Sequence, residues 1–416
     1  MAASPSFTSF SSSSFHHRHH RHHRQPQTLN PPPSLHKAII IMSASKFDHL
    51  MDTFAVNVKR ADGRTLNVPL ISSFTIASSR LDCVRNVAIR VELDDGSVGW
   101  GEAPILPLVT AEDQPLALAK VEEACRFLIF SKGFTLGLVL RDLHGLLSGH
   151  QFASVRAGVE MALIDAAAKS IDVPLWQLFG GAQNTITTDI TIPIVSPAEA
   201  SELASKYQKL GFKTLKLKVG KNLDADIEVL KAIRGVHPDC LFILDANEGY
   251  SPSEAIEVLK KLHGIGVTPV LFEQPVHRDD WDGLGHVSRI AKKEFGVSVA
   301  ADESCRSLSD VMKIVNGDLA DVINIKLAKL GVLQALNIIK VARENGLSLM
   351  IGGMVETRLA MGFAGHLAAG LGCFKFIDLD TPLLLADDPV LGGYEALGAV
   401  YKFKNAGGSG SFLRLE

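Results

Sequence analysis

The chain has 416 residues, of which 46% are hydrophobic and 21% are charged, and its formal net charge at pH 7 is -3. These values are ordinary for a globular enzyme of two domains. They give no excess of basic residues that would indicate nucleic acid as a partner. No apolar run reaches the roughly 18 residues needed to span a bilayer, so we expect no membrane partner either.

Residues 1–47 differ in composition from the rest of the chain. They contain no Asp or Glu and many Ser and Pro, and Arg residues are interleaved with histidines between His16 and His23. Such a leader, without a long apolar core, is typical of an organellar transit peptide. Metal binding by the histidines is the alternative, although no ligand spacing is fixed. We expect a disordered leader that is removed, with the mature protein in the chloroplast stroma in preference to the mitochondrion or cytoplasm.

The five cysteines are scattered without C-x-x-C or paired spacing, which is typical of reduced thiols outside the secretory pathway. Cys305 follows the Asp302-Glu303 pair and could be a nucleophile. No activating partner is evident, so packing is the favoured interpretation.

Residues 48–180 have the pattern of an α+β domain. Val87–Leu93 alternates as a strand should, a glycine-containing turn follows, and Val98–Ala103 returns as the next strand. From Ala111 to about Phe179 the apolar residues recur at helical spacing. The glycine pair Gly180-Gly181 suits the junction to a second domain.

Residues 181–380 repeat one pattern: a short apolar run, polar side chains at its end, and then an amphipathic segment of helical periodicity. The apolar runs are residues 187–192, 215–219, 241–244, 270–272, 297–301, 322–325, 347–354 and 374–380. Continuous apolar strands alternating with helices predict a parallel sheet buried on both faces. Polar groups at the C-terminal strand ends are typical of a (β/α)8 barrel. We expect the glycine-rich tail, 381–416, to pack back onto the first domain.

The run 215–219 carries two lysines, Lys216 and Lys218, on one face, because side chains two apart along a strand point the same way. Two ammonium groups in an apolar interior are expected to lower each other's pKa, which would make a lysine a better base near neutral pH. A solvated edge strand would explain an isolated pair. The polar strand ends that follow favour the buried interpretation.

Three acids, Asp245, Glu273 and Asp302, end three successive apolar runs. Their carboxylates would converge at one barrel mouth, where their mutual repulsion requires a cation. Ligands that are all oxygen suit a hard ion, above all Mg²⁺. Each acid alone could cap a following helix, but that explanation is poor for three in succession.

A third lysine, Lys326, ends the next run, so that bases flank the predicted metal site on both sides. This arrangement suits a substrate carboxylate held by Mg²⁺ and an α-carbon between two bases. The proton on such a carbon is very weakly acidic. The enediolate that forms on its removal therefore needs a divalent ion and an ammonium group to stabilise its charge.

From about residue 49 to the end, these motifs resemble the muconate-lactonizing subgroup of the enolase superfamily. The resemblance implies an α/β fold, a modified (β/α)8 TIM barrel with an N-terminal α+β capping domain that the C-terminal tail completes. It implies that Lys218 and Lys326 are the bases on opposite faces of the substrate, and that Lys216 holds the substrate carboxylate. The Mg²⁺ ligands would be Asp245, Glu273 and Asp302, supported by Asn247 and Glu303.

Within this subgroup the sequence is most similar to the dipeptide epimerases. The similarity lies in the segment Gly353-Met354-Val355-Glu356-Thr357 and in Asp378-Leu379-Asp380. In that family the Asp-x-Asp pair receives the free α-ammonium group of an L-Ala-X dipeptide, and a buried acid pair needs such a cation. A solvated strand end is the alternative. The substrate-binding positions that the resemblance implies are Thr191, Met354, Glu356, Asp378 and Asp380.

Family members selective for L-Ala-Glu carry an arginine in a loop of the capping domain. The polar segment Ser72–Asp82 is predicted to be this loop and a lid over the barrel mouth. Alignment on Phe74 and Val87 places Ser79 at the arginine position and Arg80 one residue later, so either could line the pocket. A neutral, hydrophobic or aromatic X is favoured over Glu.

The function implied is Mg²⁺-dependent epimerisation of L-Ala-L-X dipeptides at the α-carbon of the second residue, by proton transfer between two lysines. A muconate cycloisomerase or o-succinylbenzoate synthase would share the lysines and ligands but would not need a pair of acids that binds ammonium. A catalytically silent barrel is the alternative of another class, disfavoured because every ligand and base is present. The expected partner is a small dipeptide, and the resemblance implies a homo-oligomer.

Overall fold

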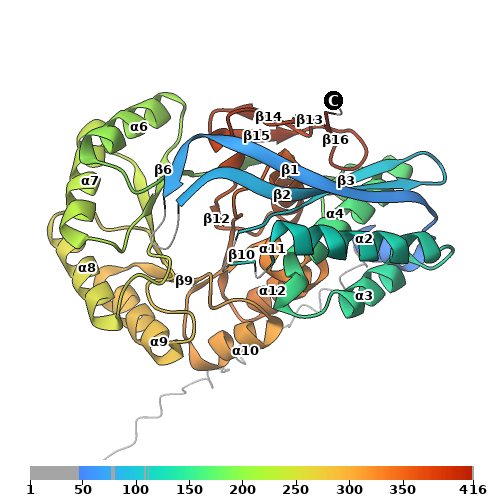
Figure 1. Ribbon diagram of the computed structural model, residues 1–416. Helices are drawn as coiled ribbons and strands as arrows, with labels where there is room; N and C mark the ends of the chain where they lie inside the picture. Colours follow the sequence, from blue (N-terminus) through green and yellow to red (C-terminus); the bar gives the residue numbers. More distant parts are fainter. Residues whose placement is uncertain (1–45, 76–79, 107–108, 111, 415–416) are drawn as a thin grey trace, which may run out of the picture. The chain divides into compact units, whose positions relative to one another are not determined.

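The computed structural model describes residues 46–75, 80–106, 109–110 and 112–414. The predicted leader therefore lies outside the described residues, except that Lys46 and Phe47 begin helix α1 (Lys46–Thr53). Figure 1 shows the described chain passing from an antiparallel sheet with helices into a curled sheet ringed by helices. None of the helices in these ranges combines the length and hydropathy that a bilayer-spanning segment requires.

The first part of the described chain is a three-stranded antiparallel sheet in the order β1-β2-β3, with helices packed against it. The strands are β1 (Val58–Thr75), β2 (Arg80–Leu93) and β3 (Val98–Ala103). The helices after α1 are α2 (Gln114–Phe130), α3 (Leu136–Leu146), the 3-10 turn η1 (His150–Phe152), α4 (Ala153–Ser170) and α5 (Leu175–Leu178).

The segment predicted to be a lid, Ser72–Asp82, is mostly strand. Thr75 of β1 pairs with Arg80 of β2, so that only residues 76–79 lie between the two strands. The prediction of a long loop is therefore wrong. Polar side chains do not prevent strand pairing, because the ladder is made by backbone groups and an antiparallel hairpin can expose polar side chains.

Helix α4 packs against the sheet backbone to backbone. A Cβ at Gly99 would lie 2.0 Å from the carbonyl oxygen of Ala162, and one at Gly101 would lie 1.9 Å from that of Gly158. Only glycine fits these two positions of β3. The alanine-rich sequence of α4 permits the same close approach from the other side, and residues 153–168 of the helix are buried.

Eight parallel strands form the curled sheet, in the order β12-β11-β10-β9-β8-β7-β6-β5. Its two edges meet where the backbone N–H of Asp189 donates to the carbonyl oxygen of Ile377, at 2.9 Å. The strands are β5 (Ile190–Ile192), β6 (Thr214–Lys218), β7 (Leu241–Asp245), β8 (Leu271–Glu273), β9 (Ser298–Ala301), β10 (Val322–Ile325), β11 (Ser348–Ile351) and β12 (Phe376–Ile377). The predicted fold class, a modified (β/α)8 barrel with an N-terminal α+β domain, is confirmed.

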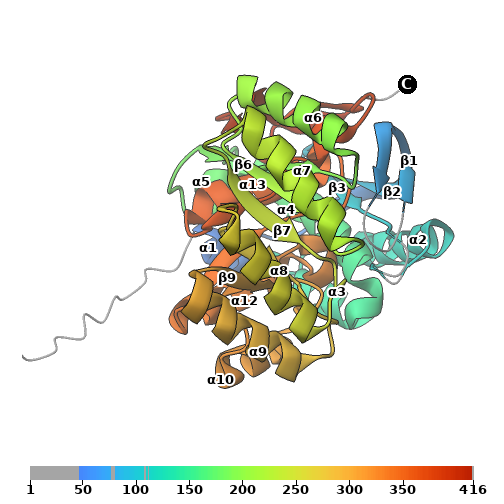
Figure 2. The same ribbon diagram turned by 90° about the vertical axis from the view of Figure 1, so that its left-hand side faces the viewer.

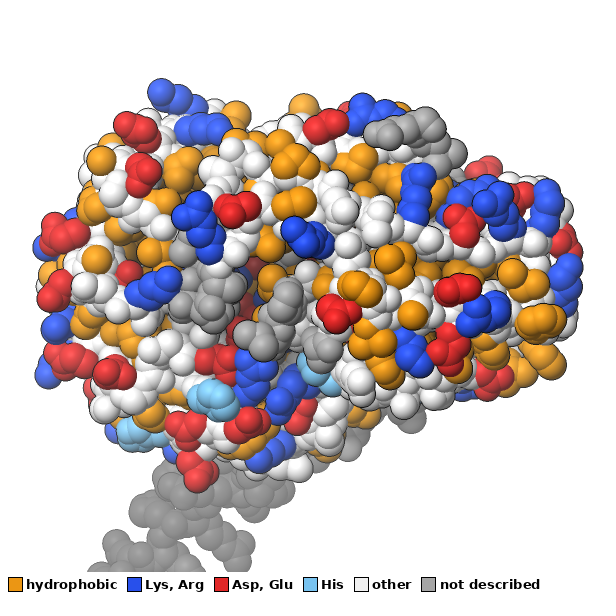
Figure 3. Space-filling model, viewed as in Figure 1, with side chains coloured by type: hydrophobic (Ala, Val, Ile, Leu, Met, Phe, Trp, Pro, Cys, Tyr) orange, Lys and Arg blue, Asp and Glu red, His pale blue; other side chains and the backbone are white. Residues whose placement is uncertain are grey.

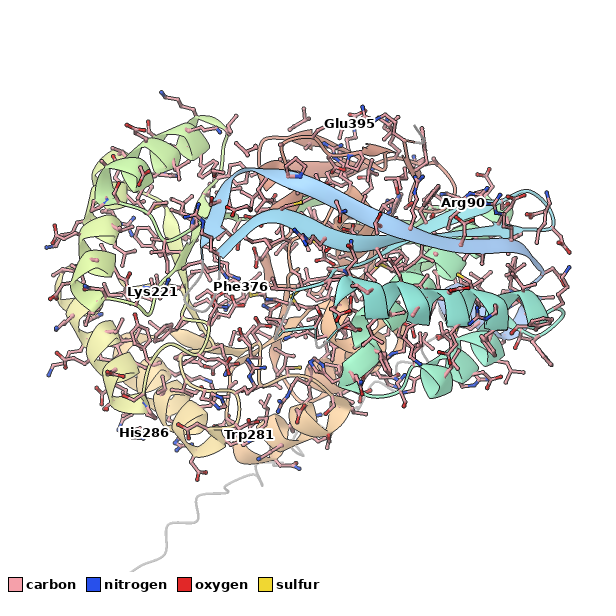
Figure 4. The ribbon with its side chains drawn as sticks, viewed as in Figure 1. Arg90, Lys221, Trp281, His286, Phe376 and Glu395 are labelled. Atoms are coloured by element: carbon pink, nitrogen blue, oxygen red, sulfur yellow. The ribbon has the colours of Figure 1, made fainter. Side chains whose placement is uncertain are left out.

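Helices follow the strands and cover the outer face of the barrel. Figures 1 and 2 show α6 to α9 side by side along it. They are α6 (Pro197–Lys209), α7 (Leu223–Val236), α8 (Pro252–Gly264), α9 (Trp281–Ile290) with the π turn η2 (Ala291–Phe295), α10 (Leu308–Gly317), α11 (Leu327–Leu330), α12 (Val332–Glu344) and α13 (Arg358–Leu371). Apolar side chains fill the barrel, among them Ile243, Val322 and Met350, with Phe376 (labelled in Figure 4) packed against them.

The chain after β12 forms the turn η3 (Thr381–Leu384) and two small sheets. β13 (Val390–Gly392) pairs with β16 (Ser411–Leu413), while β14 (Tyr394–Leu397) and β15 (Val400–Phe403) join β4 (Thr185–Thr187). The predicted first barrel strand, 187–192, is thus two strands, because β4 pairs with the tail and β5 with the barrel. Leu385, Val390 and Leu413 of the tail pack in one apolar cluster with Leu66 and Trp100 of the first sheet.

Candidate active site

The C-terminal ends of the barrel strands surround a cavity of about 200 Å³. Its lining runs from Thr191 on β5 to Asp380 beyond β12, and Leu81, Leu106 and Val109 close it from the first domain. On the face drawn in Figure 3, the acidic and basic side chains of the described residues are interspersed, without a large patch of one sign. The charged groups that matter for chemistry lie inside the cavity.

Lys216 and Lys218 project from β6 toward the carboxylates of the neighbouring strands. The Lys218 ammonium lies 2.6 Å from Asp245 Oδ2. The Lys216 ammonium is buried and shared among three acids, at 3.0 Å from Asp245, 2.8 Å from Glu273 and 2.7 Å from Asp378. Lys216 therefore connects the predicted metal ligands to the predicted ammonium-binding pair.

The expectation that Lys216 has a lowered pKa is wrong. Burial alone would lower its pKa, but the carboxylates of Asp245, Asp378 and Glu273 outweigh burial and raise the pKa of Lys216 well above its ordinary value. The pKa of Lys326 is raised for the same reason, chiefly by Asp302 against the effect of burial. In this arrangement both ammonium groups are stabilised as cations.

Asp245, Glu273 and Asp302 are buried carboxylates at the ends of three adjacent strands. Asp245 and Glu273 are direct neighbours in the parallel ladder of β7 and β8. Burial, together with the nearby Asp245 carboxylate, raises the pKa of Glu273 to about 8. A cation would relieve this repulsion, and donors that are all oxygen fit Mg²⁺.

Two asparagine residues hydrogen-bond to these acids and to the neighbouring Glu303. Asn324 Nδ2 donates to Glu273 Oε1 at 2.8 Å, and Asn247 Nδ2 donates to Glu303 Oε1 at 3.2 Å. Asn247 has a φ of 42°, which turns the chain sharply after β7 so that its own N–H also meets Asp245 Oδ1 at 3.1 Å. The structure thus places Asn247 beside both Asp245 and Glu303. Asn324 was not predicted.

Asp302 has two lysine partners. Lys326 Nζ lies 2.7 Å from Asp302 Oδ2. Lys329, one turn later on α11, is buried and donates to both the carbonyl oxygen and Oδ1 of Asp302. Lys329 was not predicted from the sequence, although the Lys-x-x-Lys spacing places two lysines on one side of a helical turn.

Helix α11, which carries Lys329, is held by α4. The Arg156 guanidinium donates to the carbonyl oxygen of Leu330 at 2.9 Å. The Glu160 carboxylate accepts from the backbone N–H of Val332, the first residue of α12. The position of Lys329 therefore depends on a helix of the first domain.

The opposite end of the cavity is a cluster of three acids. Asp378 and Asp380 line the cavity, and Asp189 lies behind them without lining it. One oxygen of each carboxyl group lies within 4.8 Å of the others, which is close enough to hold a cation. The backbone N–H of Thr191 donates to Asp380 Oδ2 at 2.6 Å. Asp378, Asp380 and Thr191 were predicted from the sequence as site residues, but Asp189 was not.

Two predicted substrate contacts are not placed in the cavity. Glu356 is buried behind the lining, where its Oε2 accepts from the backbone N–H of Met354 at 2.7 Å. Arg80 is exposed and donates to Ser73 Oγ at 2.6 Å. Leu81 takes the lining position instead, because neighbouring residues of a strand face opposite ways. Ser79, the other candidate, lies outside the described residues.

Two family models match this chain. The model described as mandelate racemase / muconate lactonizing enzyme, N-terminal domain, matches residues 55–180. The model described as enolase C-terminal domain-like matches residues 199–411. Together they span most of the first domain, the barrel from α6 onward and most of the tail.

Characterised relatives agree with these matches. An L-Ala-D/L-amino acid epimerase from Populus trichocarpa is 74% identical over 372 residues, which cover 89% of this chain and 88% of the relative. An aromatic dipeptide epimerase from Herpetosiphon aurantiacus is 38% identical, over 85% of this chain and 98% of its own. The solved dipeptide epimerase from Enterococcus faecalis V583, complexed with Mg and the dipeptide L-Leu-L-Tyr, has a TM-score of 0.78 and 32% identity, over 85% of this chain and 99% of its own. This chain therefore belongs to the dipeptide epimerases of the enolase superfamily, and it is an isomerase.

Proposed function

We propose that this protein epimerises L-Ala-L-X dipeptides at the α-carbon of the second residue, with Mg²⁺ as cofactor. The observation that carries the proposal is the placement of Lys218 and Lys326. They line one cavity from β6 and β10, and three strands of the curled sheet separate these two strands. An α-carbon held between them would present one face to each lysine.

Each lysine has one task in the reaction. One takes the α-proton as a neutral amine, and the other, as an ammonium group, returns a proton to the opposite face of the same carbon. Lys216 would hold the substrate carboxylate by its charge. Mg²⁺, held by Asp245, Glu273 and Asp302, would stabilise the negative charge that develops on that carboxylate.

The acids at the far end of the cavity support a dipeptide over other substrates of the superfamily. Asp378 and Asp380 offer negative charge where the free α-ammonium group of the first residue would lie. A cycloisomerase or synthase substrate without an amine would leave this charge without a partner in the substrate. The relative from Enterococcus faecalis, solved with Mg and L-Leu-L-Tyr, supports both the dipeptide and the metal.

The wall formed by Leu81, Leu106, Val109, Met354 and Val355 supports a neutral or hydrophobic X. These five residues line the same cavity as the lysines. An acidic side chain would have to desolvate its carboxylate against them, which is unfavourable without a partner. Arg80, which could have been that partner, does not line the cavity. Arg278 does line it, but it is already paired with Glu248, whose Oε1 accepts from Arg278 Nε at 2.8 Å.

The acid-free composition of residues 1–47 supports import into the chloroplast, and we propose the stroma as the site of the mature protein. Expression of the full chain and of a chain lacking residues 1–47, each fused to a fluorescent protein, tests this. Chloroplast fluorescence of the full chain alone is the expected result. Equal distributions of the two fusions would refute it.

The activity is tested by incubation of the purified protein, leader removed, with Mg²⁺ and a set of L-Ala-L-X dipeptides in D2O. Mass spectrometry and chiral chromatography then score deuterium at the α-carbon of X and the appearance of L-Ala-D-X. We expect L-Ala-L-Phe to react and L-Ala-L-Glu to react poorly. N-acetyl-L-Ala-L-Phe is the matched control without the ammonium group. No exchange in any dipeptide would refute the proposed function and favour the cycloisomerase alternative.

A further inference from the structure

We propose that Asp189 is a third carboxyl group of the ammonium site, and that it carries a proton which it donates in a hydrogen bond to Asp378. Asp378 and Asp380 would then alone present negative charge to the substrate. Asp189 would be a positioning residue, since it does not line the cavity. This inference rests on the proposed function for its role, although its protonation can be tested without a substrate.

Asp189 is fixed in place by the closure of the barrel. It lies between β4 and β5, and its backbone N–H donates to Ile377 of β12 at 2.9 Å. Next to it, Thr188 Oγ1 accepts from the backbone N–H of Leu379 at 2.9 Å. These bonds hold the start of β5 against the strand that leads to Asp378 and Asp380. The residue is only 3% exposed.

The three carboxyl groups differ in their hydrogen-bond donors. Asp378 accepts from Lys216, and Asp380 accepts from the Thr191 N–H. Both oxygens of Asp189 are buried and have no donor among the described residues. One carboxyl oxygen of Asp189 nevertheless lies within 4.8 Å of one of Asp378, and a hydrogen bond between the two side chains is among the causes that raise the pKa of Asp189. Two carboxyl groups can make such a bond only if one of them carries a proton.

Charge balance also favours one proton. The buried network contains four lysines and seven acids, so that three negative charges remain if every group is ionised. A bound divalent ion would reduce the net charge of the network from -3 to -1. A zwitterionic dipeptide has no net charge and would leave that value unchanged. One proton makes the occupied site neutral. The network consists of Lys216, Lys218, Lys326, Lys329, Asp189, Asp245, Glu273, Asp302, Glu303, Asp378 and Asp380.

The pKa directions agree with this geometry. Burial raises the pKa of Asp189 well above its ordinary value, and the carboxylates of Asp378 and Asp380 raise it further. Burial would also raise the pKa of Asp378, but Lys216 lowers it below the ordinary value. Neighbouring acids whose environments separate their pKa values in this way share a proton unequally.

Two substitutions of Asp189 test whether its carboxyl group is a neutral hydrogen-bond donor or a third negative charge. In Asp189→Asn the amide can donate to Asp378 as a protonated carboxyl group does, so KM for L-Ala-L-Phe should stay within about twofold of wild type. Asp189→Leu has no donor, and loss of a hydrogen bond to a charged group should raise KM about tenfold with a smaller change in kcat. A raised KM in Asp189→Asn equal to that in Asp189→Leu would overturn the inference.

Infrared spectroscopy of the free enzyme tests the proton directly. The difference spectrum of wild type minus Asp189→Asn should contain the C=O stretch of one protonated carboxyl group. Other buried acids such as Glu356 cancel in this difference. Absence of the C=O band from the difference spectrum would overturn the inference even if wild type epimerises dipeptides. Failure of wild type to epimerise any dipeptide, with the band present, would refute the proposed function and the role in ammonium binding but not the shared proton.

Discussion

Replacing Asp380 by Asn removes one negative charge from the proposed ammonium site at nearly constant volume. In the structure Asp380 Oδ2 accepts from the Thr191 N–H, while Oδ1 is buried without a partner among the described residues. The amide oxygen of Asn can keep the bond to Thr191. The amide NH2 group therefore takes the place of Oδ1, where it would face the ammonium group of the substrate.

The expected loss is one hydrogen bond between charged groups. Such a bond contributes about 1.5–3 kcal/mol, which corresponds to an increase in KM of about 10- to 150-fold. Affinity for Mg²⁺ should change by less than about twofold, because Lys216 donates to Asp378 and not to Asp380 and the predicted metal ligands keep their partners.

The assay combines steady-state kinetics with L-Ala-L-Phe at saturating Mg²⁺ and calorimetric titration of Mg²⁺. Asp378→Asn is the matched variant, since it removes a partner of Lys216 and should weaken both dipeptide and Mg²⁺ binding. If Asp380→Asn weakened both to the same extent, or left KM unchanged, the assignment of Asp380 to the substrate's ammonium would be refuted.

Three further predictions test other parts of the molecule. Lys326→Ala should abolish epimerisation but retain deuterium exchange from one stereoisomer, because Lys218 still reaches its own face; normal epimerisation would contradict the roles of the two lysines. Chelation of Mg²⁺ should stop turnover and lower the melting temperature, since a cation bound to the folded state stabilises it; an unchanged melting temperature would count against the proposed site. Gly99→Ala should lower the free energy of unfolding by about 3 kcal/mol or more in urea titrations, because its Cβ meets the backbone of α4. Gly145→Ala, with open space around it, should raise that free energy by about 0.5 kcal/mol, and equal effects of the two would contradict the contact.

The barrel could be predicted because its strands are continuous apolar runs that end in polar residues. The same pattern identified the groups at the strand ends, since parallel strands bring their carboxyl ends to one side. The break between β4 and β5 could not be predicted, because it depends on the tail pairing with β4 from more than 200 residues away. Asp189, which lies at that break, was missed for the same reason.

Electrostatics and side-chain direction were harder to predict than position. The pKa of Lys216 depends on four acids that are distant in the sequence, Asp245, Asp378, Glu273 and Asp189, whereas the sequence shows only its neighbour Lys218. Arg80 was considered because the family resemblance implies an arginine in this loop of members selective for L-Ala-Glu, where it would pair with the substrate's side-chain carboxylate. A shift of one residue along a strand exchanges the two faces, and Leu81 took the lining position.

Helix α4 makes the two domains interdependent in a way that matters for recombination between relatives. Its backbone fits against the glycines of β3, and its Arg156 and Glu160 hold the turn that carries Lys329. A chimera that joins the first domain of one relative to the barrel of another would separate residues that fit each other at this helix. Such chimeras should be active only when residues 153–170 come from the same parent as the Lys326–Val332 segment. This should hold whichever parent supplies the apolar residues that line the cavity.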